Sequence, residues 1–238
     1  MYADRLNDIA PFRVMELLQR AQDLERAGHR VAHLEVGEPD FATAKPIAEA
    51  GIAAIESGQT KYTPALGEPE LRQQITAYYR ELGVEVPWQR VVVTSGASGG
   101  LTLLSGLLLQ PGARLLVTDP GYPCNEVFAA LVNAPVTRVP VTADNGFQLT
   151  AEQVRAHWHD ADGAPAAGLL LASPANPTGV MQTRPNLQAV LTQLGASGGF
   201  TIVDEIYQGL VYRAQPEYRS ALQLDGEVFV LNSFSKYF

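Results

Sequence analysis

Five short polar segments, each preceded by a short apolar run, carry most of the residues of this chain that could do chemistry. They supply a Gly/Ser turn, an aromatic ring, an amide, a carboxylate beside a phenol, and a lysine. The segments are residues 95–98, 119–122, 173–177, 204–207 and 233–236. Ligands of open parallel sheets bind at the carboxyl ends of the strands. If the apolar runs are parallel strands, the five segments therefore meet at one crevice.

Lys236 follows an apolar run and is the strongest candidate for a nucleophile. A lysine with a lowered pKa attacks carbonyl groups, and enzymes that use pyridoxal 5′-phosphate hold this cofactor through such a Schiff base. Asp204 could keep the pyridine nitrogen protonated, while Asn176 and Tyr207 could donate hydrogen bonds to the phenolate oxygen. Tyr122 could stack on the ring. Each residue also has a structural interpretation, such as a solvated lysine, a capping aspartate or a turn asparagine.

The Gly/Ser turn opens an apolar helix, where free backbone N–H groups and the positive end of the helix dipole can bind a phosphate. Gly96, Ala97 and Ser98 form this turn. The hydroxyls of Ser233 and Ser235 could complete the phosphate shell. A strand-to-helix turn that binds nothing is the alternative at this point.

Ser98 also has a competing interpretation as a hydrolase nucleophile. Residues 96–100 match the G-x-S-x-G nucleophile elbow in its expected setting between a strand and a helix. Such a hydrolase needs an acid and a histidine on later loops. The later histidines, His157 and His159, fall inside a predicted helix, which weakens this hypothesis but leaves it open. Residues 233–236 match S-x-x-K, and we discount a β-lactamase-like site because the sequence has no S-D-N or K-T-G motif.

Helical and strand signals alternate along the chain, which predicts an α/β fold with a mostly parallel sheet and helices on both of its faces. The expected strands are residues 90–94, 114–118, 136–140, 168–172, 200–203 and 228–232. The expected helices are residues 11–26, 46–57, 68–82, 99–109, 123–133, 150–160 and 185–197.

The composition excludes several classes of protein and partner. With 238 residues, 46% of them hydrophobic, the chain can bury a core. Its net charge of −8 argues against nucleic acid or a membrane surface as a partner. The single cysteine, Cys124, excludes an internal disulfide and a cysteine-based zinc site, and we expect no bound metal. Since no signal peptide or membrane span is evident, we expect a soluble, cytoplasmic protein.

Motifs of a known family follow one another along essentially the whole chain. They are LEVGEPDF at 34–41, KY at 61–62, GEPELR at 67–72, SGAS at 95–98, SPANPTG at 173–179, DEIY at 204–207 and SFSK at 233–236. In this order they closely resemble the class I/II pyridoxal-phosphate-dependent aminotransferases of the aspartate aminotransferase type, which have fold type I.

The resemblance implies a role for each matching position. Lys236 would form the Schiff base with the cofactor and carry a proton between the substrate α-carbon and the cofactor. Asp204 would pair with the pyridine nitrogen, and Tyr122 would cover the ring. Asn176 and Tyr207 would donate to the phenolate oxygen. The phosphate would be bound by Gly96, Ala97, Ser98, Ser233 and Ser235.

The resemblance also implies substrates and a partner. The enzyme would move an amino group between an amino acid and a 2-oxo acid, with Gly37 and Asn176 beside the substrate. Tyr62 would reach the cofactor of a neighbouring subunit, so a homodimer is implied. A lyase of the same fold, acting by C–S cleavage or elimination, stays open as an alternative. The sequence does not name the amino acid.

Two arginines of the family pattern have no match in this sequence. One follows the lysine and clamps the phosphate, and the other lies in a small C-terminal domain and binds the substrate carboxylate. We therefore expect residues 1–35 to form an N-terminal arm and helix, and residues 36–238 an incomplete large cofactor-binding domain. In this interpretation the small C-terminal domain is missing and the chain is truncated after the catalytic lysine. Whether the chain alone is active stays open.

Overall fold

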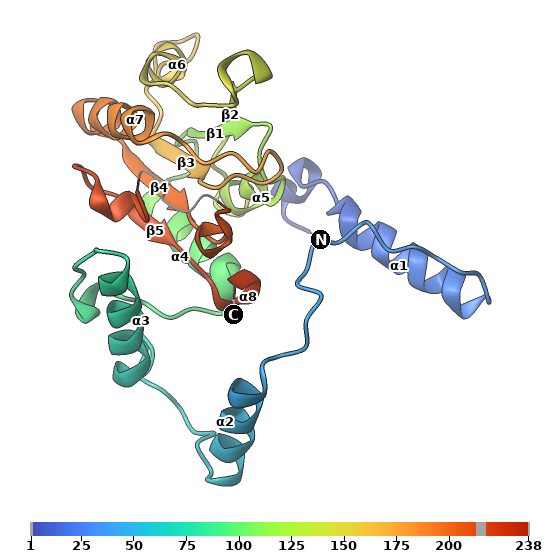
Figure 1. Cartoon of the computed structure of the whole chain (residues 1–238). Helices are drawn as coiled ribbons and strands as arrows, with labels where there is room; N and C mark the ends of the chain where they lie inside the picture. Colours follow the sequence, from blue (N-terminus) through green and yellow to red (C-terminus); the bar gives the residue numbers. More distant parts are fainter. Residues whose placement is uncertain (1, 213–217, 238) are drawn as a thin grey trace. The chain divides into compact units, whose positions relative to one another are not determined.

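The computed structural model describes residues 2–212 and 218–237. The chain divides into two compact units, Met1–Ala42 and Thr43–Phe238. Figure 1 shows the chain coloured from its N-terminus in blue to its C-terminus in red. From the sequence we expect a boundary after residue 35, between an N-terminal arm and the cofactor-binding domain. That boundary stays a prediction.

The unit Met1–Ala42 is built around one amphipathic helix. Its helical elements are η1 (Asp4–Asp8) and α1 (Arg13–Arg26). Gly28 follows α1 with a φ of +90°, a left-handed conformation that glycine adopts without a steric cost. Beyond it, His33 lies 3.1 Å from a carboxylate oxygen of Glu25 and 2.6 Å from one of Glu35. Hydrogen bonds to Glu35 and Glu25 raise the pKa of His33.

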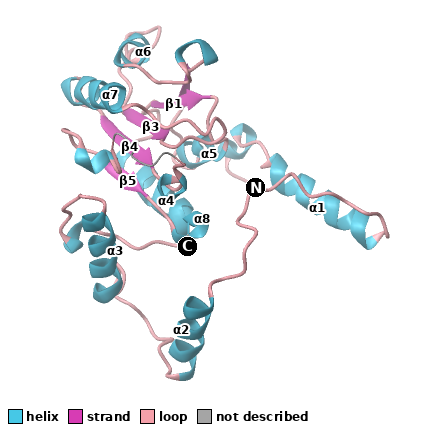
Figure 2. Cartoon of the chain, viewed as in Figure 1, coloured by secondary structure: helices cyan, strands magenta, loops and turns pink. Residues whose placement is uncertain are grey.

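The unit Thr43–Phe238 contains a sheet in which every strand pairs in parallel. The strands are β1 (Leu115–Asp119), β2 (Val136–Pro140), β3 (Gly168–Ala172), β4 (Phe200–Asp204) and β5 (Phe229–Leu231). Their order across the sheet is β2-β1-β3-β4-β5. Figure 2 shows the strands in magenta and the helices in cyan.

Helices cover both faces of this sheet, as predicted (Figure 1). The covering helices are α4 (Gly96–Leu108), α5 (Cys124–Ala130), α6 (Ala151–His157) and α7 (Arg184–Ala196). Successive strand residues point to opposite faces. In β1, Leu116 belongs to one buried cluster with residues of α6 and α7, whereas Leu115 and Val117 belong to a second cluster with residues of α4 and α5. The predicted α/β fold is therefore confirmed.

Two further helices precede the sheet in the chain, α2 (Lys45–Glu56) and α3 (Pro69–Glu81). No residue of α2 is buried. Hydrogen bonds connect α3 and the residue after it to two residues near the C-terminus. The side-chain amide of Asn232 donates to the Tyr79 hydroxyl at 3.3 Å, and that of Gln223 donates to the Leu82 carbonyl at 3.0 Å.

The remaining elements are short. They are η2 (Trp88–Arg90), η3 (Ala143–Asn145), η4 (Gln208–Leu210), η5 (Ala221–Gln223) and α8 (Phe234–Tyr237). Within the described ranges, no helix combines the length and the apolar character that crossing a bilayer requires.

The prediction of a strand at residues 90–94 is wrong. A strand needs a neighbouring strand to take its N–H and carbonyl groups, and here other groups take them. The Val93 N–H donates to the Leu66 carbonyl at 3.0 Å, and the buried Arg72 side chain donates to the Val91 carbonyl at 2.7 Å. The segment is extended but unpaired, so the described sheet has five strands and not the expected six.

The helix expected at residues 123–133 is also too long, because α5 ends at Ala130. Asn133 adopts a left-handed φ of +57°, and the Ala134 N–H donates back to the Ala129 carbonyl at 3.0 Å. This arrangement terminates a helix, and asparagine tolerates it better than most residues.

Candidate active site

The order of the strands creates a crevice at the carboxyl edge of the sheet. The chain leaves β1 toward β2 on one side, and it leaves β3 toward β4 on the other side. The loops after β1 and β3 therefore diverge, which is the topological switch point where ligands bind in open α/β sheets. Tyr122 lies in the first of these loops and Asn176 in the second.

The N-terminus of α4 has the features of a phosphate site. Gly96 has a φ of +67°, and its N–H donates to the Thr94 carbonyl at 2.8 Å. Among the described residues, the next two amides, of Ala97 and Ser98, donate no hydrogen bond, and no side chain caps the helix. Free amides at the positive end of a helix dipole bind anions.

Close packing brings this turn to the end of β5. A Cβ atom placed on Gly100 would lie 2.6 Å from a methyl group of Leu231, so a side chain at this position would push helix and strand apart. Leu231 is the last residue of β5 and leads into the segment that carries Lys236. The Gly/Ser turn and the lysine segment are therefore neighbours.

The segment after β5 presents hydroxyls and the lysine together. The Ser233 and Ser235 hydroxyls are 2.9 Å apart, and the Ser235 N–H donates to the Ser233 hydroxyl at 3.2 Å. The Asn232 side chain accepts from the Ser233 N–H at 2.8 Å. Lys236 lies in α8 and is half-buried.

Asp204 occupies the centre of the site. The register pairs it with Ala172 of β3 on one side and with Leu231 of β5 on the other. Its carboxylate is buried and accepts the Ile206 N–H at 3.0 Å. Burial raises its pKa, and no cationic side chain of the described residues forms an ion pair with it. A buried carboxylate in this state fits a ligand that brings its own positive charge, as a protonated pyridine nitrogen does.

Tyr122 lies near two other predicted site residues. It is half-buried and hydrogen-bonded to the thiol of Cys124. Burial raises the pKa of Tyr122, and after the hydrogen bond to Cys124 the smaller contributions come from Tyr207 and Asp204. These side chains therefore share one region. Cys124 was not predicted as a neighbour of Tyr122, although its position two residues further along the chain was a signal.

The loop that carries Asn176 is anchored by a buried hydroxyl. Ser173, at the start of this loop, makes a 2.8 Å hydrogen bond with the Tyr218 hydroxyl and accepts the Gln182 N–H at 3.0 Å. Within the loop, the Ala175 N–H donates to the Val180 carbonyl at 2.9 Å. Asn176 is thus half-buried on a loop fixed from both sides.

Glu205, a fully buried acid next to Asp204, was not predicted from the sequence. Its carboxylate accepts the Ala221 N–H at 2.6 Å. Burial raises the pKa of Glu205 to about 8. Neighbouring residues at the end of a strand point to opposite faces, so the alternation of side chains in β4 was the available signal.

The structure does not support a histidine base for Ser98 from the later part of the chain. Arg114, just before β1, donates to the His157 carbonyl at 2.9 Å, so the end of α6 lies at the start of β1. Ser98 lies at the start of α4, beside the carboxyl end of β5. His157 and its neighbour His159 thus lie at the opposite edge of the sheet.

Two predicted residues, Tyr62 and Gly37, are not among the side chains described above. Tyr62 is fully exposed, with a relative accessibility of 106%. Gly37 belongs to the unit Met1–Ala42. Their roles beside a partner's cofactor and beside the substrate stay predictions.

Comparison with known proteins identifies the family. A family model for "Aminotransferase class I and II" matches residues 30–238, which include all five polar segments of the site. The chain belongs to the class I and II aminotransferases.

Members of this family align along almost the whole chain. The valine–pyruvate aminotransferase of Mycobacterium tuberculosis is 36% identical over 231 residues, which are 97% of this chain and 58% of the relative. An aspartate aminotransferase of Geobacillus stearothermophilus is 30% identical over 98% of this chain and 60% of its own length. The crystal structure of an aminotransferase from Mycobacterium tuberculosis has a TM-score of 0.91 at 35% identity, covering 100% of this chain and 60% of that chain. This chain thus spans about 60% of the length of these aminotransferases.

Proposed function

We propose that this chain binds pyridoxal 5′-phosphate at the carboxyl edge of its sheet and moves an amino group between an amino acid and a 2-oxo acid. The observation that carries the proposal is the position of Asp204. This buried carboxylate lacks a cationic partner among the described residues and lies between the strand ends that lead to Asn176 and Lys236. Membership of the aminotransferase family supports the same chemistry.

The phosphate of the cofactor would lie at the N-terminus of α4. The free amides of Ala97 and Ser98 supply hydrogen-bond donors there, together with the dipole of the helix. The hydroxyls of Ser98, Ser233 and Ser235 add further donors. Gly96 lets the backbone turn toward the anion because its left-handed conformation carries no steric cost in glycine.

Bound pyridoxal phosphate supplies an aldehyde that condenses with amines and a ring that accepts electrons from the substrate α-carbon. The ε-amine of Lys236 would be the nucleophile that holds the cofactor, and it would also move a proton at the substrate α-carbon. Asp204 holds the proton on the pyridine nitrogen. Asn176 and Tyr207 would donate hydrogen bonds to the phenolate oxygen, and Tyr122 would stack on the ring.

A covalent labelling experiment tests this proposal. The chain is incubated with pyridoxal phosphate and reduced with borohydride, and the modified peptide is identified by mass spectrometry. We expect the adduct on Lys236 and its loss in Lys236→Ala. Lys45→Ala is the matched control, because Lys45 is an exposed lysine of α2 that pairs with Glu49. An adduct that persists in Lys236→Ala at full yield would contradict the proposal.

We assign two substrates for the first assay, valine and pyruvate, because the valine–pyruvate aminotransferase is 36% identical to this chain. Transfer of the amino group would convert both substrates in equal amounts. A lyase of the same fold would leave this pair unchanged, because the valine side chain carries no leaving group. Release of ammonium and a 2-oxo acid from cysteine, which has a thiol on its β-carbon, would instead indicate a lyase.

A homodimer is part of the proposal, with Tyr62 reaching the cofactor of the partner. Its support is apolar surface near Tyr62 in the sequence. On α2, Ile47, Ile52 and Ile55 are 50%, 56% and 69% exposed. Exposed apolar side chains gathered on one element are typical of an interaction surface.

We also assign the protein to the cytoplasm. The support is the content of one cysteine, Cys124, in 238 residues. Proteins of reducing compartments keep their thiols reduced, whereas secreted proteins commonly carry disulfides. Fractionation of cells that express the tagged protein tests this assignment.

A further inference from the structure

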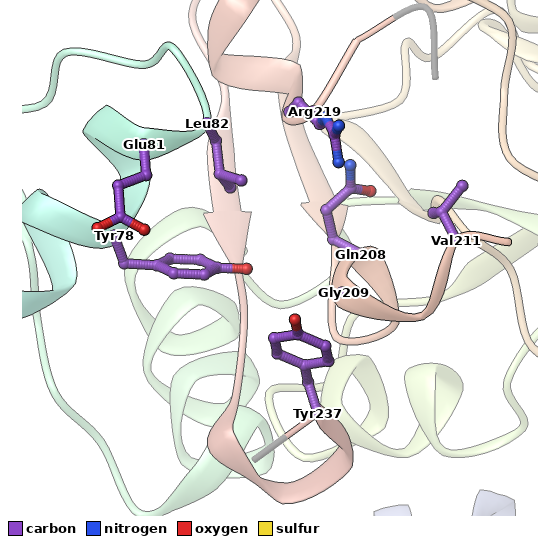
Figure 3. Close-up of a pocket in the computed structure, with 8 residues that line it drawn as sticks. All are labelled: Tyr78, Glu81, Leu82, Gln208, Gly209, Val211, Arg219 and Tyr237. Carbon is purple, nitrogen blue, oxygen red and sulfur yellow. The ribbon is translucent and has the colours of Figure 1, made fainter. Parts of the chain in front are cut away.

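A cavity of this chain is lined by none of the residues assigned to the cofactor. It has a volume of about 340 Å³ and lies between α3, the η4 segment after β4, and α8. Figure 3 shows the residues that line it. A volume of this size falls in the range of small-molecule sites, which begins at about 300 Å³.

The most informative residue in this cavity is Gln208. Gln208 is buried, with only 7% of the residue exposed. Neither the nitrogen nor the oxygen of its amide has a hydrogen-bond partner. A buried amide without partners destabilises a fold. An occupant that offers both an acceptor and a donor would remove this cost.

Opposite charges line the same cavity. Arg219 contributes a guanidinium and Glu81 a carboxylate, and within the described part of the chain neither forms an ion pair. Figure 3 shows the Gln208 amide directed toward the side of the cavity where Arg219 lies. The cavity thus offers both a cationic and an anionic group to a ligand.

Two phenols complete the lining. Figure 3 shows the hydroxyls of Tyr78 and Tyr237 pointing into the space between them. Burial raises the pKa of Tyr78, and the nearby Tyr237 adds to the rise while Arg219 opposes it. Tyr78, Tyr237 and Arg219 are therefore electrostatic neighbours, and both hydroxyls can donate to an anion.

We propose that this cavity binds an α-amino acid that does not react there. The carboxylate of the ligand pairs with Arg219 and accepts from the amide nitrogen of Gln208. Its ammonium group faces the carboxylate of Glu81. A phosphate or another dianion fits less well, because the carboxylate of Glu81 repels it.

The position of Tyr237 connects this cavity to the lysine. Tyr237 directly follows Lys236 in α8. A Cβ atom on Gly209 would lie 2.4 Å from the Tyr237 ring, so the ring packs closely on the η4 backbone. A ligand in the cavity would contact this ring and so restrict the helix that carries the lysine. The site would then act as a regulatory site for the same chain.

Calorimetric titration of the full chain with L-alanine, without added cofactor, tests the proposal. Lys236→Ala is titrated in parallel to separate this cavity from the lysine site, and we expect it to bind equally well. Arg219→Met should weaken binding about tenfold or more, because it removes a charge-assisted contact. Arg155→Met is the matched control, since Arg155 is an exposed arginine on α6, remote from the cavity lining.

Gln208→Met provides an independent readout. This change removes an unpaired amide and nearly preserves the shape of the side chain, so the ligand-free variant should melt at a higher temperature than the wild type. It should also bind L-alanine several-fold more weakly. Acetate and methylamine, which each carry one half of the ligand, should bind at least tenfold more weakly than alanine.

Three results would overturn the proposal. The first is the absence of binding in the wild type. The second is unchanged affinity in both Arg219→Met and Gln208→Met. The third is that acetate binds as tightly as alanine. The ammonium group and Glu81 would then contribute nothing to binding, and the ligand would not be an amino acid.

Discussion

Asp204 is the residue on which the proposed cofactor chemistry depends most. Asp204→Asn keeps the shape of the side chain and an acceptor for the Ile206 N–H, but it removes the charge that pairs with a pyridinium. A hydrogen bond to a charged group contributes about 1.5–3 kcal/mol. We therefore expect pyridoxal phosphate to bind about 10- to 100-fold more weakly, as measured by absorbance titration.

Stability measurements distinguish this effect from unfolding. Burial of the Asp204 charge opposes folding, so Asp204→Asn should be at least as stable as the wild type. Weaker cofactor binding together with a lower melting temperature of the free protein would point to a structural role instead.

Glu205 makes the stability of the chain depend on pH. Burial raises its pKa from 4.5 to about 8, so the folded chain holds a proton that the unfolded chain has lost between these values. The free energy of unfolding should therefore fall as the pH rises through this window, by up to about 1.4 kcal/mol per pH unit. Glu205→Gln should show a flatter profile in urea titrations between pH 5 and pH 8. Equal slopes in the two proteins would contradict this expectation.

At the scale of single residues, the sequence predicts which side chains could do chemistry, but it does not predict how deeply each one is buried. Lys236, Asp204 and Asn176 are predicted because each follows an apolar run in a recognisable motif. The burial of Glu205 and Gln208 could not be predicted in the same way. Their environments depend on contacts made across the fold, such as the bond from the Ala221 N–H to Glu205.

Among the elements, the loop after β1 depends on close backbone packing. A Cβ atom on Gly121 would lie 2.4 Å from the Thr118 carbonyl oxygen, so Gly121→Ala forces the backbone to move. We expect a loss of about 1–3 kcal/mol in the free energy of unfolding, comparable to overpacking in a core. Tyr122 follows directly, so cofactor affinity should fall as well.

Gly106→Ala is the matched control. Gly106 lies in α4 with nothing within 4 Å of the added methyl group. Alanine favours a helix over glycine by about 1 kcal/mol, so this variant should be more stable in the same urea titration. Destabilisation of both variants by the same amount would contradict the steric explanation.

The elements themselves were largely predictable, because buried parallel strands are short apolar runs between amphipathic helices. The strands at 136–140 and 168–172 have the predicted bounds. The run at 90–94 has the same composition but no strand beside it, and a pairing partner cannot be found from local composition. Strand propensity alone therefore does not predict whether a segment joins the sheet.

For the whole molecule, the proposed homodimer predicts a solution mass of twice 25.7 kDa by sedimentation. Ile52→Asp and Ile55→Asp place charges on the exposed apolar side chains of α2. We expect these variants to dissociate without loss of helical circular dichroism. Glu152→Lys, on the exposed surface of α6, is the control. A monomeric wild type, or variants that remain dimeric, would contradict the assignment of this surface.

The register of β4 has a consequence for how this region can change during evolution. Asp204 and Glu205 are adjacent buried acids with different surroundings. Asp204 lies at the crevice, whereas Glu205 accepts the Ala221 N–H. A one-residue insertion or deletion within β4 exchanges the faces of all following side chains. It would bring Glu205 into the crevice and remove the acid that receives the Ala221 N–H. Lineages of this chain should therefore accumulate substitutions in β4 but keep its length constant.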